Sequence, residues 1–97
     1  MMSPQPSETP RILVVDDSCE NLRALEAMLK AQGYEVSAQP SGELALEAVG
    51  RVQPHLILLD IVMPGLDGYE VCTRLKAAPE FQDIPVLFLS GLTQAAD

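Results

Sequence analysis

The sequence contains few basic residues, and this shortage argues against several classes of protein. Its 97 residues include 6 Lys and Arg against 14 Asp and Glu, which gives a net charge of −8. Direct binding to nucleic-acid phosphates or to an anionic membrane surface is therefore not expected, because both depend on clustered basic side chains. An acidic site that holds a cation fits this charge balance better.

Long apolar runs and secretion signals are also missing. No apolar run approaches the ~20 residues of a membrane span, and the opening segment, MMSPQPSETP, has neither the basic nor the apolar region of a signal peptide. The two cysteines, Cys19 and Cys72, match no metal-binding or disulfide pattern, so free thiols are expected. We therefore expect a cytoplasmic protein, with residues 1–10 as a flexible leader and residues 11–97 as one domain.

Aromatic residues make up only 4% of the sequence and Trp is absent, so the core must be mostly aliphatic. Four segments have the pattern of β-strands, the second of them weaker and suited to a sheet edge: 12–15, 34–38, 56–59 and 86–89. Helical periodicity lies between them, at 18–32, after Ser41, and between Asp67 and Pro79. This alternation predicts an α/β fold, in which a parallel sheet carries helices on both faces.

The predicted helices have capping residues and apolar faces. Asp17 or Ser18 can cap the first helix, Ser41 the second, and Asp67 with Glu70 the third. The first two helices are expected to turn these side chains inward: Leu22, Leu25, Met28 and Leu29 in the first, and Leu44, Ala45, Ala48 and Val49 in the second.

Acidic or hydroxyl side chains follow three of the predicted strands. Asp16 and Asp17 follow the first strand, Asp60 follows 56–59, and Ser90 follows 86–89. Ligands bind at the carboxyl ends of strands in open parallel sheets, and acids on neighbouring strands would lie close together there. Close carboxylates repel one another unless a cation intervenes, and Mg2+ is a hard cation that prefers such oxygen ligands.

A carboxylate in such a site can attack phosphorus and form an acyl phosphate. Asp60 is the best candidate nucleophile because it stands alone, whereas Asp16 and Asp17 can hold the metal and Ser90 can bind a phosphoryl oxygen. The simpler alternative is that the acids form turns or cap helices, as Asp17 could. A dinucleotide site would need G-x-G-x-x-G after the first strand, and a phosphohydrolase would need an Asp-x-Asp pair; the sequence has neither there.

Three segments carry a specific resemblance: VVDDS, LILLDIVMPGLDGYE and PVLFLS. Together they resemble the receiver domain of two-component response regulators, over residues 11–97. The resemblance implies a flavodoxin-like, doubly wound parallel sheet with strand order 2-1-3-4. It also implies a regulatory domain rather than an enzyme, with any phosphotransfer self-catalysed, and a histidine kinase or histidine phosphotransfer protein as partner.

The resemblance further implies roles for particular residues. Asp60 corresponds to the phosphoacceptor and Ser90 to the switch hydroxyl. Asp16 and Asp17 correspond to the acidic pair that binds Mg2+, together with Asp60 and the backbone carbonyl of Val62.

The sequence departs from this family after strand 86–89. Family members continue with a fourth helix, a fifth strand and a fifth helix, and a Lys at the end of the fifth strand pairs with the phosphoryl group. We expect a domain that is incomplete at its carboxyl end and lacks the fifth strand and helix. The apolar edge of strand 86–89 would then be unpaired and could form a homodimer. The alternative function is a truncated receiver that acts only as an interaction or dimerisation module, without phosphorylation.

Overall fold

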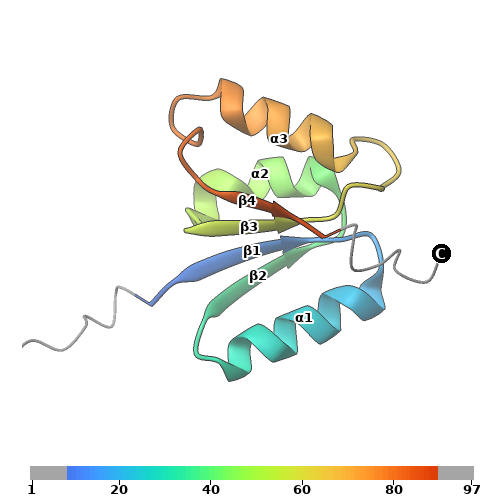
Figure 1. The fold of residues 1–97 in the computed structure, drawn as a ribbon, viewed down its shortest axis with the longest axis vertical. Helices are drawn as coiled ribbons and strands as arrows, with labels where there is room; N and C mark the ends of the chain where they lie inside the picture. Colours follow the sequence, from blue (N-terminus) through green and yellow to red (C-terminus); the bar gives the residue numbers. More distant parts are fainter. Residues whose placement is uncertain (1–8, 90–97) are drawn as a thin grey trace, which may run out of the picture.

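The computed structural model describes residues 9–89, which form a parallel sheet with helices on both faces (Figure 1). The strands are β1 (Arg11–Val15), β2 (Glu35–Gln39), β3 (Leu56–Leu59) and β4 (Val86–Phe88). The helices are α1 (Cys19–Ala31), α2 (Gly42–Val52) and α3 (Gly68–Ala77). The strands lie in the order β2-β1-β3-β4, which confirms the predicted fold class and strand order.

The apolar strands β1 and β3 form the centre of the sheet because both of their faces are covered. In Figure 1, α1 covers one face, and α2 and α3 cover the other. Side chains alternate between two cores: Leu13 and Val15 pack on the side of α2 and α3, and Ile12 and Val14 pack on the side of α1. β2 lies at one edge, as its weaker apolar pattern predicts, and its side chains are exposed or half-buried.

Polar side chains start each helix where the sequence predicts. The hydroxyl of Ser18, not the carboxylate of Asp17, caps α1, and the hydroxyl of Ser41 caps α2. Asp67 and Glu70 form a capping box at α3: the Asp67 carboxylate accepts from the Glu70 N–H at 2.9 Å, and Glu70 accepts from the Asp67 N–H at 3.0 Å. These caps satisfy N–H groups that have no partner within the helix.

Two side chains predicted to turn inward are instead exposed. Met28 is 54% exposed and Leu44 is 42% exposed. At about 3.6 residues per turn, Met28 lies about 120° around α1 from the buried Leu22, at the border of the inward face. Leu44 lies at the flank of the α2 face formed by Ala45 and Val49, which are buried. The prediction was wrong at these positions because an apolar side chain at the border of a helix face can remain in water.

Two further features of residues 9–89 bear on the expectations drawn from composition. Cys19 and Cys72 are both free, as predicted. None of α1, α2 and α3 is long and apolar enough to cross a membrane.

Candidate functional site

The sheet brings the acids that follow β1 and β3 to the same edge. The two strands pair in parallel, and the N–H of Asp60 donates to the carbonyl of Val15 at 2.9 Å. The N–H of Asp16 donates to the carbonyl of Gln39, in β2, at 3.2 Å. One carboxylate oxygen from each of Asp16, Asp17 and Asp60 lies within 4.8 Å of the other two. The three acids therefore form one cluster.

The three acids differ in exposure and in hydrogen bonding. Asp16 is 1% exposed and Asp60 is 5% exposed, whereas Asp17 lies on the surface. Both oxygens of Asp16 accept hydrogen bonds, one from the N–H of Ser18 at 2.9 Å and one from the side-chain amide of Asn21 at 3.3 Å. Within residues 9–89, Oδ1 of Asp60 is buried and has no hydrogen-bond partner. Because such an atom loses its water without compensation, it is suited to binding a ligand.

Burial and neighbouring charges raise the pKa of Asp60 from its ordinary value of 3.8 to about 6. Burial is the largest cause, followed by the negative charges of Asp16 and Asp17. A hydrogen bond with the Asp16 carboxyl group raises the pKa further, and a hydrogen bond with the backbone of Val62 lowers it. Without a cation, Asp60 therefore keeps its proton up to a pH of about 6.

The loop after β3 is held closely against Asp60. Gly65 has a φ of 75°, which other residues adopt rarely. The N–H of Gly68, at the start of α3, donates to the carbonyl of Ile61 at 2.8 Å. A Cβ atom on Gly68 would overlap the carbonyl oxygen of Asp60, so this close approach requires glycine. Met63 is buried in the core on the side of α2 and α3. These contacts fix the backbone that carries the Asp60 carboxylate.

Two predicted site residues keep their roles as predictions, and one site residue was missed. Val62 is 61% exposed, and metal binding by its carbonyl stays a prediction. Ser90 lies outside residues 9–89, so its role also stays a prediction. Asn21, which contacts Asp16, was not among the predicted residues. A polar side chain in the first turn of the helix after the acids could have indicated it.

The cluster has the chemistry of a site for a hard divalent cation. Its ligand atoms are carboxylate oxygens, two of the acids are buried, and Oδ1 of Asp60 has no other partner in the described part of the chain. Mg2+ usually binds through one or two carboxylates and several waters. The donor set therefore fits Mg2+, and the buried oxygen of Asp60 is the observation that favours it.

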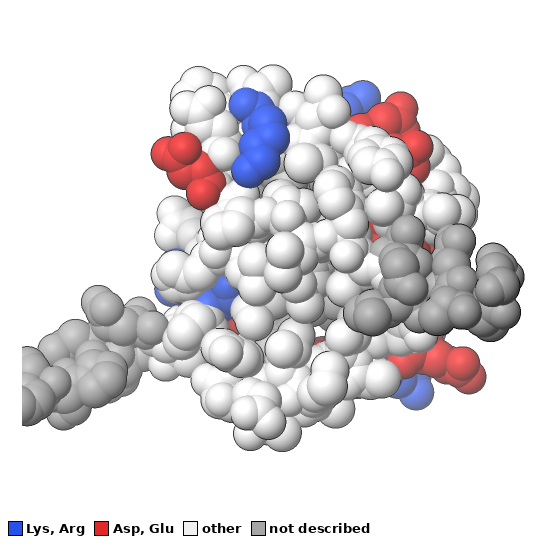
Figure 2. Space-filling model, in the orientation of Figure 1, with Lys and Arg blue, Asp and Glu red and all other residues white. Residues whose placement is uncertain are grey.

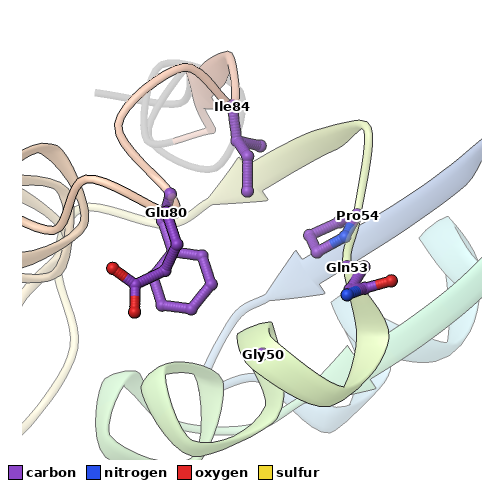
Figure 3. A pocket seen from close by; sticks show the side chains of 6 residues that line it. Gly50, Gln53, Pro54, Glu80 and Ile84 are labelled. Carbon is purple, nitrogen blue, oxygen red and sulfur yellow. The ribbon is translucent and has the colours of Figure 1, made fainter.

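A hollow of about 510 Å³ lies at the opposite end of the sheet (Figure 3). It lies between the end of α2 and the segment before β4, and its lining residues are Gly50, Gln53, Pro54, Glu80, Phe81 and Ile84. These residues come before β3 and β4, whereas Asp16 and Asp60 come directly after β1 and β3. Glu80 is the one acidic residue in this lining, and a single carboxylate is a poorer cation site than three clustered ones. The acidic cluster therefore remains the candidate site.

Comparison with known families identifies the family of this chain. The family model of the response regulator receiver domain matches residues 12–97. The chain belongs to the response regulator receiver family. Receiver domains are regulatory domains of two-component systems. The family match confirms the resemblance that the motifs VVDDS and LILLDIVMPGLDGYE indicated.

Curated receiver-containing relatives are much longer than this chain. The response regulator PleD of Caulobacter vibrioides is 48% identical over 87 residues, which are 90% of this chain and 19% of PleD. A probable cyclic di-GMP phosphodiesterase of Vibrio cholerae is 44% identical over 86 residues, which are 89% of this chain and 19% of that protein. The chain thus spans about a fifth of the length of these relatives.

Solved receiver structures share the fold. The N-terminal domain of a response regulator receiver protein from Methanoculleus marisnigri is 45% identical with a TM-score of 0.78, over 80% of this chain and 63% of that one. The chemotaxis protein CheY4 of Vibrio cholerae is 26% identical with a TM-score of 0.79, over 82% of this chain and 67% of that one.

Proposed function

We propose that this receiver domain accepts a phosphoryl group on Asp60 in a Mg2+-dependent reaction, and that the donor is a histidine kinase or a histidine phosphotransfer protein. The main support is the buried Oδ1 of Asp60, which has no partner within residues 9–89 and lies beside two other acids. Buried acids with a raised pKa beside other charged groups are typical of functional sites.

The proposed step is a substitution at phosphorus. A carboxylate oxygen of ionised Asp60 bonds to the phosphorus of a phosphohistidine, the P–N bond breaks, and the leaving imidazole takes a proton from water. Asp60 must be ionised, which its pKa of about 6 allows at neutral pH. Asp16, Asp17, Asp60 and the carbonyl of Val62 would hold Mg2+, which when bound offsets negative charge on the phosphoryl oxygens. Ser90 would donate a hydrogen bond to one of those oxygens.

The setting of this reaction follows from composition. Free Cys19 and Cys72 suit a reducing compartment, so we place the reaction in the cytoplasm. A net charge of −8 makes nucleic acid or an anionic membrane an unsuitable direct partner. An interaction module that is never phosphorylated is the less favoured alternative, because it would have no use for three clustered carboxylates, two of them buried.

Mg2+ binding is the first testable consequence. At pH 8, Mg2+ is expected to raise the thermal unfolding midpoint, with about 2.7 kcal/mol of added stability at 100 times the dissociation constant. The Asp17→Asn variant should need more Mg2+ for the same shift, because it loses one exposed ligand of the cluster. Asp83→Asn, which removes an exposed acid before β4, is the control and should behave as wild type. Absence of a Mg2+ effect on the wild type would count against the proposed function.

We also propose that a second copy of the chain pairs with the outer edge of β4. β4 contacts β3 through the carbonyl of Pro85, at 3.0 Å, and the N–H of Leu89, at 2.9 Å. Alternate residues of a parallel strand face each neighbour, so the backbone groups of Val86 and Phe88 point away from β3. No residue between 9 and 89 pairs with that edge. Around a two-fold axis, Val86 of one copy could pair antiparallel with Phe88 of the other and satisfy these groups.

The side chains along the β4 edge are apolar and uncharged, which suits contact between two copies of a negatively charged chain. Leu87 is 55% exposed and Phe88 is 40% exposed, and residues 84–89 include no charged side chain. In Figure 2, the centre of the visible face, where β4 lies in Figure 1, has no Lys, Arg, Asp or Glu. Since each copy carries a charge of −8, an uncharged edge is where two copies can meet with the least repulsion.

Replacing Leu87 with Lys is expected to weaken this dimer about tenfold or more, because Leu87 is 55% exposed and the two copies together lose ~1.5–3 kcal/mol of apolar burial. Sedimentation equilibrium over a range of concentrations measures the effect. Leu44→Lys places the same charge on an exposed Leu of α2 and should leave association unchanged. A monomer at every concentration, or equal effects of the two variants, would rule out the β4 interface.

A further inference from the structure

Asn21 and Ser18 hold the buried carboxylate of Asp16 from two sides. The N–H of Ser18 donates to Oδ1 at 2.9 Å, and the side-chain amide of Asn21 donates to Oδ2 at 3.3 Å. Asn21 is itself fixed, because its backbone N–H donates to the capping hydroxyl of Ser18 at 3.3 Å. The first turn of α1 therefore sets the orientation of an acid that directly follows β1.

The chemical type of Asn21 suits a residue beside a cation site. Its amide is neutral, so it donates to Asp16 without adding a positive charge that would repel a metal ion. Each carboxylate oxygen can accept two hydrogen bonds or ligand contacts, so the single bonds from Ser18 and Asn21 do not saturate Asp16. Asn21 thus supplies a neutral side-chain donor to the cluster from outside the three acids.

We propose that Asn21 is a positioning residue for the metal site. It holds the Asp16 carboxylate in a fixed orientation beside Asp60, so that the ligand is already in place when a cation binds. This inference rests on the proposed Mg2+-dependent function and adds a residue that contacts a ligand rather than the metal. Such supporting hydrogen bonds typically change metal affinity by about 10–100-fold when removed.

Isothermal titration with Mg2+ at pH 8 tests the inference on the wild type and on Asn21→Ala. We expect Asn21→Ala to weaken Mg2+ binding about tenfold or more. Gln32→Ala removes a carboxamide from the exposed far end of α1 and serves as the matched control, with unchanged affinity. If Asn21→Ala does not fold, Asn21→Ser replaces it, because the shorter serine side chain does not span the distance to Asp16.

Thermal unfolding in EDTA and in saturating Mg2+ separates positioning from a purely structural role. A structural role would lower both midpoints equally and leave the Mg2+ affinity unchanged, and that result would overturn the inference. If the wild type itself binds no Mg2+, the proposed function fails. If the wild type binds Mg2+ and Asn21→Ala binds it equally well, only the role of Asn21 fails.

Discussion

The Gly68→Ala variant is expected to lose about 3 kcal/mol of folding stability, since overpacking a tight site costs about 1–3 kcal/mol and backbone clashes lie at the upper end. The added Cβ would overlap the carbonyl oxygen of Asp60 and lie 2.8 Å from Cα of Ile61. Both are backbone atoms, and the N–H of Gly68 is bonded to the Ile61 carbonyl at 2.8 Å, so neither side can move away easily. The displaced atoms belong to the segment that carries Asp60, so Mg2+ binding should weaken as well.

Gly50→Ala is the matched control for this substitution. Gly50 lies in the exposed part of α2, where a Cβ would meet only the ring of Phe81 at an ordinary 3.6 Å. Because alanine is favoured over glycine in a helix, this variant should gain about 0.5–1 kcal/mol. Urea denaturation followed by circular dichroism measures both variants. Equal stabilities of the two would show that the contact between Gly68 and Asp60 is looser than described.

Asp60→Asn is expected to make the metal-free protein more stable at neutral pH. The folded-state pKa of Asp60 is about 6, above its ordinary value of 3.8, so the folded protein binds its proton more tightly than the unfolded chain does. The contribution of Asp60 to the free energy of unfolding is therefore fully present below pH about 4. It falls as pH rises from about 4 to about 6 and stays constant at higher pH. A shift of this size corresponds to on the order of 3 kcal/mol, which the neutral Asn side chain would recover.

Urea denaturation in EDTA between pH 4 and pH 8 measures this effect as the difference between the wild type and Asp60→Asn. The difference should be small at pH 4 and largest above pH 6, whereas the difference for Asp83→Asn should not follow this profile. Saturating Mg2+ should narrow the gap at pH 8, because a cation offsets the repulsion among Asp16, Asp17 and Asp60. A pH-independent difference would mean that Asp60 ionises at its ordinary pKa.

The fold could be predicted largely because its signals are local. The apolar runs at 12–15 and 56–59 mark strands buried on both faces, and the structure extends or shortens predicted elements by only a few residues at their ends. The capping box at Asp67 is also local, since its two side chains lie three residues apart. The proximity of Asp16 and Asp60 follows once β1 and β3 are neighbours, because both acids come directly after paired strands.

Other features depend on packing that the sequence does not display. The exposure of Met28 and Leu44, at the borders of their helix faces, depends on how far the neighbouring elements cover each face, which periodicity alone does not fix. The contact between Asn21 and Asp16 depends on how the first turn of α1 enters the cluster. The unpartnered Oδ1 of Asp60 likewise depends on the three-dimensional arrangement of its neighbours. The Asn21 contact and the unpartnered oxygen of Asp60 are the features that turn three acids close in space into a candidate metal site.

Phosphoryl transfer to Asp60 is most directly tested by intact mass spectrometry of the wild type and Asp60→Asn after incubation with a small phosphodonor such as phosphoramidate. The wild type should gain one phosphoryl group when Mg2+ is present and none in EDTA, and Asp60→Asn should gain none in either condition. A folded, Mg2+-bound wild type that gains no phosphoryl group, or a gain that persists in Asp60→Asn, would contradict the assignment of Asp60 as the phosphoacceptor.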